Sequence, residues 1–194
     1  YYNSLDIQGS NIWASNPAAA IYYRSTNNGN TWIEGSLPGQ PYQIQDMDFY
    51  NESVGYAVGF AGQAFRSSDG GITWQILPTP NQVDQLTDIY LVGQNELWVS
   101  TNSNSVYYTA NAGQSWAILN TNSQGFGFFS SIVASTTGDA WTAGYQGYIQ
   151  HFTGPPPPPL NQLPTASFDY NPNGLTIDFV DASTDLDGSI VSWN

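Results

Sequence analysis

Short runs of alternating or purely apolar residues recur along the first four fifths of the chain. Examples are "DMDFY", "VGYAVGF", "QAFRS" and "TWQIL", and Gly, Asn, Ser or Pro separates one run from the next. Alternation with a period of two is typical of strands, and no segment sustains the 3.6-residue period of a helix. The pattern therefore predicts an all-β fold made of short antiparallel strands.

These runs belong to a repeat. Trp32, Trp74 and Trp116 are spaced 42 residues apart, and a glycine three residues before each of them keeps the same interval. A second aromatic position recurs upstream, at Trp13, Tyr56, Trp98 and Trp141. A period of about 40 to 45 residues with four strands per unit is the signature of β-propeller blades. We therefore expect about four blades, the last without its motif, either as an unusual four-bladed ring or as part of a larger propeller.

The motif itself resembles a known one. "SSDGGITW" (67–74) matches the Asp-box pattern Ser-x-Asp-x-Gly-x-Thr-Trp of the bacterial neuraminidase (BNR) repeat, and "STNNGNTW" (25–32) and "TANAGQSW" (109–116) are weaker copies. The chain thus resembles propellers of the sialidase-like or photosystem II assembly-factor type. The resemblance implies a structural hairpin on the outer rim, between the third and fourth strands of a blade. Its residues here are Ser25, Asn27, Gly29, Thr31, Trp32, Ser67, Asp69, Gly71, Thr73, Trp74, Thr109, Asn111, Gly113, Ser115 and Trp116.

The chemistry of the motif fits a turn without a ligand. Asp or Asn accepts hydrogen bonds from nearby backbone N–H groups, and glycine supplies a positive φ. The hydroxyl groups tie the loop, and the tryptophan is expected to pack between blades. We therefore interpret the three Asp boxes as structural turns and not as functional sites.

The amino-acid composition of the chain changes after the repeats. "TGPPPPPLNQLP" predicts an extended polyproline spacer. The residues that follow resemble the first half of a polycystic-kidney-disease (PKD) domain, an immunoglobulin-like β-sandwich. We predict a propeller over residues 1–154, a linker over 155–163 and part of a PKD-like domain over 164–194, and we expect the sequence to be a piece of a larger protein.

Charge limits the classes of partner. The chain has 2 Lys or Arg against 15 Asp or Glu, a net charge of −13. Such a chain repels phosphate backbones and anionic lipid, which argues against nucleic-acid binding. No apolar run reaches the roughly 18 residues of a membrane span, so direct membrane insertion is not expected. There is no Cys, hence no disulfide.

Few residues in the sequence support an enzymatic function. A sialidase needs an arginine cluster around its substrate carboxylate, and Arg24 and Arg66 lie one repeat apart and cannot converge. A glycoside hydrolase needs two carboxylates roughly 5 to 10 Å apart. Asp46, Asp48 and Asp88, at the starts of innermost strands, are the catalytic candidates. The alternative for these three is a solvated acidic channel rim.

Binding candidates come from the aromatic and acidic residues. Tyrosines are doubled at 22–23 and 107–108, and because neighbours in a strand face opposite ways, Tyr22 and Tyr108 are candidates for stacking on a sugar. Packing between blades or subunits explains the same pattern. Asp181, Asp185 and Asp187 could hold a calcium ion, or form an ordinary PKD turn.

The sequence favours a non-catalytic recognition, adhesion or spacer module of a secreted or cell-surface bacterial protein. Its expected partners are glycans, other surface proteins or further copies of itself. Two alternatives remain open. The first is an accessory or partial catalytic propeller of a secreted polysaccharide-degrading glycoside hydrolase. The second is the repeating subunit of an extracellular filament.

Overall fold

The computed structural model describes residues 4–16, 20–39, 43–120, 128–152, 168–173 and 176–181, the last two ranges only as strands. The chain divides into two compact units, Tyr1–Pro159 and Leu160–Asn194. In the described ranges, no helix is long and apolar enough to cross a lipid bilayer. The candidate site lies in the first unit.

The first unit contains four antiparallel sheets, each formed by consecutive strands, which we call blades 1 to 4. Blade 1 comprises β1 (Leu5–Gln8), β2 (Asn11–Asn16), β3 (Ile21–Ser25) and β4 (Ile33–Ser36). Blade 2 comprises β5 (Ile44–Phe49), β6 (Gly55–Gly59), β7 (Ala64–Ser67) and β8 (Gln75–Leu77), with the 3₁₀ turn η1 (Phe60–Gly62) before β7. Blade 3 comprises β9 (Leu86–Leu91), β10 (Leu97–Thr101), β11 (Ser105–Thr109) and β12 (Ala117–Asn120). Blade 4 has three described strands, β13 (Phe129–Ala134), β14 (Ala140–Gly144) and β15 (Ile149–Phe152), with η2 (Tyr145–Gly147) before β15.

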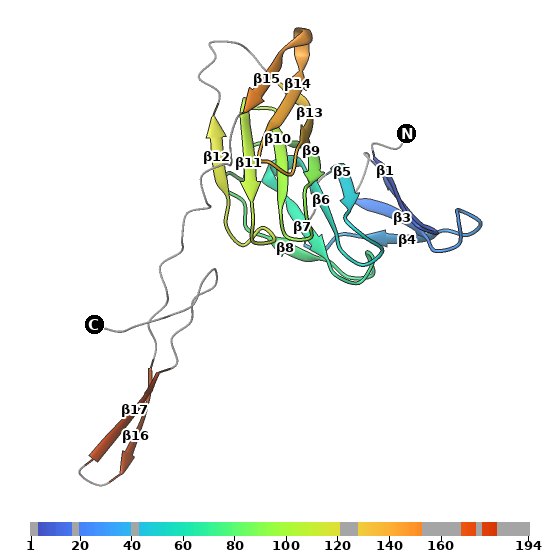
Figure 1. Cartoon of the computed structure of the whole chain (residues 1–194). Coiled ribbons are helices and arrows are strands. Elements are labelled where there is room, and N and C mark those ends of the chain that lie inside the picture. The colour runs from blue at the N-terminus through green and yellow to red at the C-terminus, as the bar shows by residue number, and fades with distance from the viewer. Residues whose placement is uncertain are drawn as a thin grey trace. The chain divides into compact units, whose positions relative to one another are not determined.

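The blades follow one another in chain order. The first strand of each blade is innermost: β1 contacts β5, β5 contacts β9 and β9 contacts β13. Blades 1 and 4 consequently lie at the two ends of an arc (Figure 1). The all-β prediction and the prediction of propeller-type blades are confirmed.

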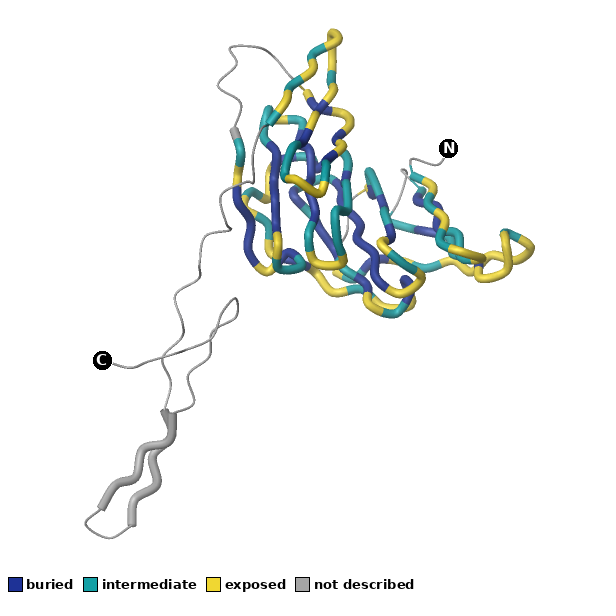
Figure 2. Tube along the Cα trace, viewed as in Figure 1, coloured by how far each residue is buried: buried dark blue, intermediate teal, exposed yellow. Residues whose placement is uncertain are grey.

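The core lies between neighbouring blades. Each interface is a layer of apolar side chains, and at the first of them Trp13 of blade 1 stacks on Phe49 of blade 2 with ring centroids 3.7 Å apart. Blades 2 and 3 are covered on both faces, so all residues of β6 and of β10 are buried. Figure 2 shows this burial in the middle of the array and greater exposure in blades 1 and 4.

Gly55 shows how closely the side chains of paired strands pack within blade 2, since it lies directly opposite Phe49. A Cβ atom added there would lie 2.3 Å from the Phe49 ring. The ring therefore occupies the space that any larger residue would need, and only glycine fits at this position.

The second unit contains one described hairpin, β16 (Phe168–Asn173) paired with β17 (Thr176–Asp181). Asp181 is the last residue of β17. The predicted calcium ligands Asp185 and Asp187 and the predicted linker 155–163 lie outside the described residues. A single hairpin is common to many β folds, so the PKD-like sandwich stays a prediction.

Candidate functional site

The Asp box of blade 2 is a closed network of hydrogen bonds. The Asp69 carboxylate accepts the N–H groups of Ile72 (3.0 Å) and Thr73 (2.9 Å) and the Thr73 hydroxyl (2.6 Å). Ser67 Oγ donates to Asp69 and accepts the N–H of Gly71. Burial opposes ionisation of Asp69, but the hydrogen bonds from Thr73 and Ser67 outweigh it and lower the pKa. The side-chain oxygens of Ser67, Asp69 and Thr73 are therefore bonded within the turn itself.

The other two boxes repeat the network with asparagine. Asn27 Oδ1 accepts the N–H of Thr31 while Nδ2 donates to its hydroxyl, each at 2.9 Å. Asn111 makes the same pair of bonds with Ser115. The glycine of each box has φ between +80° and +82°, the left-handed region that favours glycine. The amide thus replaces the carboxylate without changing the turn.

The tryptophans of the boxes differ in burial. Trp116 of blade 3 is buried and donates from Nε1 to the carbonyl of Pro78, at the end of blade 2 (2.6 Å). Trp74 of blade 2 packs against Tyr22 of blade 1. Each of these two side chains therefore reaches the preceding blade. Trp32 of blade 1 is 44% exposed because no described blade precedes it.

The carboxylates of the inner strands lie side by side and join the blades. Asp46 of β5 accepts the N–H of Ile89 in β9 (2.9 Å), and Asp88 of β9 accepts the N–H of Ile132 in β13 (2.6 Å). Asp48 accepts the N–H of Leu91. The three catalytic candidates thus lie on the innermost strands, and each binds the backbone of the next blade.

Sequence reasoning missed a fourth member of this group. Asp6 of β1 accepts the N–H of Phe49 in β5 at 2.9 Å. The interval between Asp6 and Asp48 is the repeat length, and both residues lie opposite the recurring aromatic position of the second strand. This shared position in the repeat is the feature of the sequence that could have identified Asp6.

Crowding of these acids changes their ionisation. Burial first, and then the neighbouring Asp6 and Asp46 carboxylates, raise the pKa of Asp48 to about 7. Burial and Asp46 likewise raise the pKa of Asp88. A carboxyl group that titrates near neutrality can act as a general acid, but these groups are occupied by backbone N–H donors. Among the described residues, no group of three or more His, Cys, Asp or Glu could hold a metal ion.

The two tyrosine candidates are buried, which contradicts their expected exposure. Tyr22 is 4% exposed and donates to the carbonyl of Gly71 in the next blade (2.6 Å). Tyr108 is 7% exposed, donates to Glu96 (3.0 Å) and has its ring 4.9 Å from Trp98. Neither ring can stack on a sugar. The alternation rule could not reveal this burial because a blade inside a propeller buries both of its faces.

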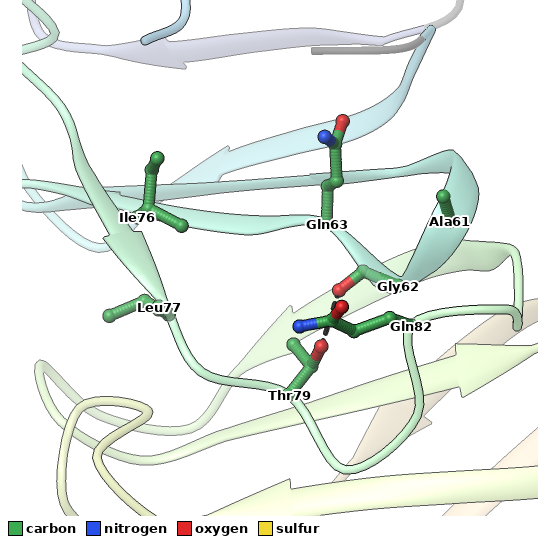
Figure 3. A pocket seen from close by; sticks show the side chains of 7 residues that line it. All are labelled: Ala61, Gly62, Gln63, Ile76, Leu77, Thr79 and Gln82. Atoms are coloured by element: carbon green, nitrogen blue, oxygen red, sulfur yellow. Dashed lines mark hydrogen bonds between the residues drawn. The ribbon is translucent and has the colours of Figure 1, made fainter. Parts of the chain in front are cut away.

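A groove that sequence reasoning did not identify lies at the end of blade 2 (Figure 3). Its volume is about 360 Å³, and its walls come from the η1 turn, from β8 and from the loop leading to β9. Thr79 Oγ1 closes the floor by donating to the carbonyl of Gly62 (2.6 Å). The lining residues are Ala61, Gly62, Gln63, Ile76, Leu77, Thr79 and Gln82.

The groove is suited to an extended chain. None of the described residues that line it carries a charge, and it combines the apolar Ile76 and Leu77 with side-chain amides and backbone groups. Ile76 is exposed, on the edge strand of its sheet. Edge strands present unpaired backbone groups, and a peptide can add to them as a further strand.

The four consecutive antiparallel blades define this chain as a β-propeller protein. Its sequence matches the model of the Photosynthesis system II assembly factor YCF48 family over residues 30–151, and the chain belongs to that family. This membership indicates a non-catalytic propeller module. Among curated proteins, none matches the chain.

Solved structures support the fold. The structure described as YCF48 bound to D1 peptide is 21% identical, with a TM-score of 0.52, and the match covers 78% of this chain and 44% of that one. YCF48 from Cyanidioschyzon merolae is 17% identical, with a TM-score of 0.62 and coverage of 78% and 53%. The β-propeller domain of Cps50 (Swd1) from Myceliophteria thermophila is 14% identical, with a TM-score of 0.60 and coverage of 78% and 51%. The matched part of the chain spans about half the length of each of these structures.

The family corrects one prediction. An extracellular or cell-surface location is wrong, because the relatives are assembly factors of photosystem II, which is not an extracellular complex. The expectation of an extracellular location comes from the resemblance of the C-terminal residues to a PKD domain. One of these relatives is described as bound to a D1 peptide, which is a property of that protein.

Proposed function

We propose that this chain is a non-catalytic propeller module that binds an extended segment of a partner protein in the groove of blade 2. The observation that supports the proposal most strongly is the family match over residues 30–151. The solved complex of a relative with a D1 peptide supports the class of ligand. That peptide is a property of the relative and serves here as a probe.

The groove supplies both kinds of contact that such a segment needs. The exposed Ile76 of β8 offers apolar surface for one side chain of the peptide, and the amide of Gln82 offers a donor and an acceptor for its backbone. The edge of β8 adds main-chain hydrogen bonds. Main-chain bonding gives affinity, and the apolar contact selects the side chain.

The charge of the chain sets a preference among segments. The groove itself is uncharged, but it lies in a chain of net charge −13. Long-range attraction then favours peptides with Lys or Arg flanking an apolar residue, and salt screens this attraction. Affinity for a basic segment is expected to fall as ionic strength rises.

Titration of a fluorescein-labelled D1 peptide with the full chain, followed by anisotropy, tests the proposal. Two further peptides carry the same apolar residues with flanking lysines or flanking glutamates. We expect the lysine-flanked peptide to bind most tightly, the D1 peptide less tightly and the glutamate-flanked peptide most weakly. Ile76→Glu should abolish it, whereas Ile118→Glu, at the equivalent exposed position of blade 3, should leave it unchanged. Absence of binding for all three peptides, or equal loss in both variants, would contradict the proposal.

The C-terminal unit is assigned by resemblance. We retain as proposals a linker over residues 155–163 and a PKD-like domain over residues 164–194, which would act as a spacer. The support is the run of five prolines and the strand pattern of the sequence that follows.

A further inference from the structure

The loop that forms one wall of the groove is fastened at both ends to the turn opposite it. This loop, residues 79–84, lies in the connection between β8 and β9. At its start, Thr79 Oγ1 donates to the carbonyl of Gly62, and at its end the carbonyl of Asp84 accepts the N–H of the same Gly62, each at 2.6 Å. Both backbone groups of Gly62 are thus bonded to the loop, and the shape of the groove depends on where the loop lies (Figure 3).

Blade 3 holds the same loop through two aromatic side chains. The hydroxyl of Tyr107 in β11 donates to the Asp84 carboxylate at 2.5 Å, and Trp116 Nε1 donates to the carbonyl of Pro78, directly before the loop. Tyr107 and Asp84 are both buried, so little water reaches the bond between them. The end of the loop is therefore held by a residue of the neighbouring blade that does not itself line the groove.

The bond between Tyr107 and Asp84 connects the position of a buried side chain to the position of the loop. Burial first, and then the hydrogen bond and charge of Asp84, raise the pKa of the Tyr107 hydroxyl, which therefore remains a donor at alkaline pH. A buried acceptor that loses its donor is destabilised and gains free energy by moving into water. Because the backbone of Asp84 also bonds Gly62, that movement would release the end of the loop.

The hydroxyl of Tyr107 is not needed to build a blade. Phe65 and Ile149 occupy the equivalent position in blades 2 and 4, and neither side chain has a hydroxyl. Tyr23, the equivalent residue of blade 1, donates to Glu34 of its own blade. The bond from Tyr107 to the loop is therefore a feature of the blade that adjoins the groove, and not of the repeat.

We propose that Tyr107 and Asp84 are positioning residues for the groove, and that their bond holds loop 79–84 in the place that an extended peptide needs. Blade 3 then sets the affinity of a site on blade 2. This inference rests on the proposed function of the groove. Ordering a loop on binding weakens affinity, and a site that is formed only part of the time binds more weakly in proportion to that fraction. Loss of the bond should therefore lower affinity although every groove residue is retained.

Binding of the lysine-flanked fluorescein peptide to the full chain, followed by anisotropy, measures this effect. Tyr107→Phe should weaken binding by about tenfold, because a hydrogen bond to a charged group contributes roughly that factor to closure of the loop. Asp84→Ala should weaken binding to the same extent, and Asp84→Asn, which keeps an oxygen acceptor for the hydroxyl, should restore most of the affinity. The double variant Tyr107→Phe, Asp84→Ala should lose no more than either single variant, since both remove the same bond.

Tyr108→Phe is the matched control. It removes a hydroxyl that also donates to a carboxylate, that of Glu96, from the neighbouring position of the same strand, and neither residue lines the groove. The peptide affinity of this variant should equal that of the native chain.

Hydrogen exchange of the peptide-free chain separates this inference from the proposed function. The Gly62 amide, which donates to the Asp84 carbonyl, should exchange faster in Tyr107→Phe than in the native chain and at the native rate in Tyr108→Phe. A native chain that binds no peptide but shows this difference would overturn the proposed function and support the fastening of the loop. Unchanged exchange at Gly62, unchanged affinity of Tyr107→Phe for a peptide that the native chain binds, or an equal loss in Tyr108→Phe would overturn the inference.

Discussion

Replacing Asp48 with asparagine should stabilise the propeller unit at alkaline pH. The folded-state pKa of Asp48 is about 7, above its ordinary value of 3.8, because of burial and of the nearby Asp6 and Asp46. Between these two values the folded state binds more protons than the unfolded chain. The contribution of this group is therefore fully present below about pH 4 and is lost as pH rises through about 7.

The pKa difference sets the size of the effect. It corresponds to about 4 kcal/mol of protonation-linked free energy, of which about 2 to 3 kcal/mol is lost between pH 5 and pH 8. Asparagine keeps an oxygen that accepts the Leu91 N–H but carries no charge. The difference in unfolding free energy between the variant and the native chain should therefore shift in favour of the variant by up to about 2 to 3 kcal/mol from pH 5 to pH 8.

Urea unfolding followed by tryptophan fluorescence measures this difference, since six of the seven tryptophans lie in the propeller repeats. Native and Asp48→Asn chains are compared at pH 5 and pH 8. The native chain should be the less stable at pH 8, and the variant should show a smaller dependence on pH. A native chain that gains stability from pH 5 to pH 8, or a variant that is weaker than it at pH 8, would refute the reasoning.

Three further substitutions test the packing. Asp69→Ala removes the acceptor for four donors of the blade 2 box and should cost about 1 to 3 kcal/mol in urea unfolding. Asp69→Asn should restore most of this stability, because Asn27 makes the equivalent bonds in blade 1. Gly71→Ala places a Cβ atom 3.1 Å from the Trp13 side chain at a backbone φ of +80°. Gly147→Ala is strained in the same way at φ +76°, but its Cβ atom meets no atom within 4 Å. Gly71→Ala should therefore lower Tm by several degrees more than Gly147→Ala. Tyr22→Ala should cost about 3 to 5 kcal/mol of stability, and an unchanged Tm would contradict its burial.

The repeat made the architecture predictable. Trp74 and Gly71 recur at a constant interval because every blade has the same turn and the same neighbours, so spacing alone predicts the blades. The upstream aromatic position predicts a buried face in the same way, and three of its four members are 1% exposed. Trp141, the fourth, departs from the pattern because its blade lies at the end of the array.

The sites were less predictable because they depend on how blades meet. Tyr22 looked available for a ligand since a single strand shows two faces, but the carbonyl of Gly71 comes from another blade. The raised pKa of Asp48 likewise depends on Asp6, one repeat away in sequence. The groove of blade 2 has no signature at all, since Gln82 and Ile76 meet there only through the path of a loop.

Hydrogen exchange of the full chain with and without the D1 peptide, read by mass spectrometry, tests the central claim most directly. The account predicts slower exchange of backbone amides in residues 61–63 and 76–82, which form the walls of the groove, and unchanged exchange in the equivalent strand 117–120 of blade 3. Protection centred on another blade, or no protection at saturating peptide, would contradict it.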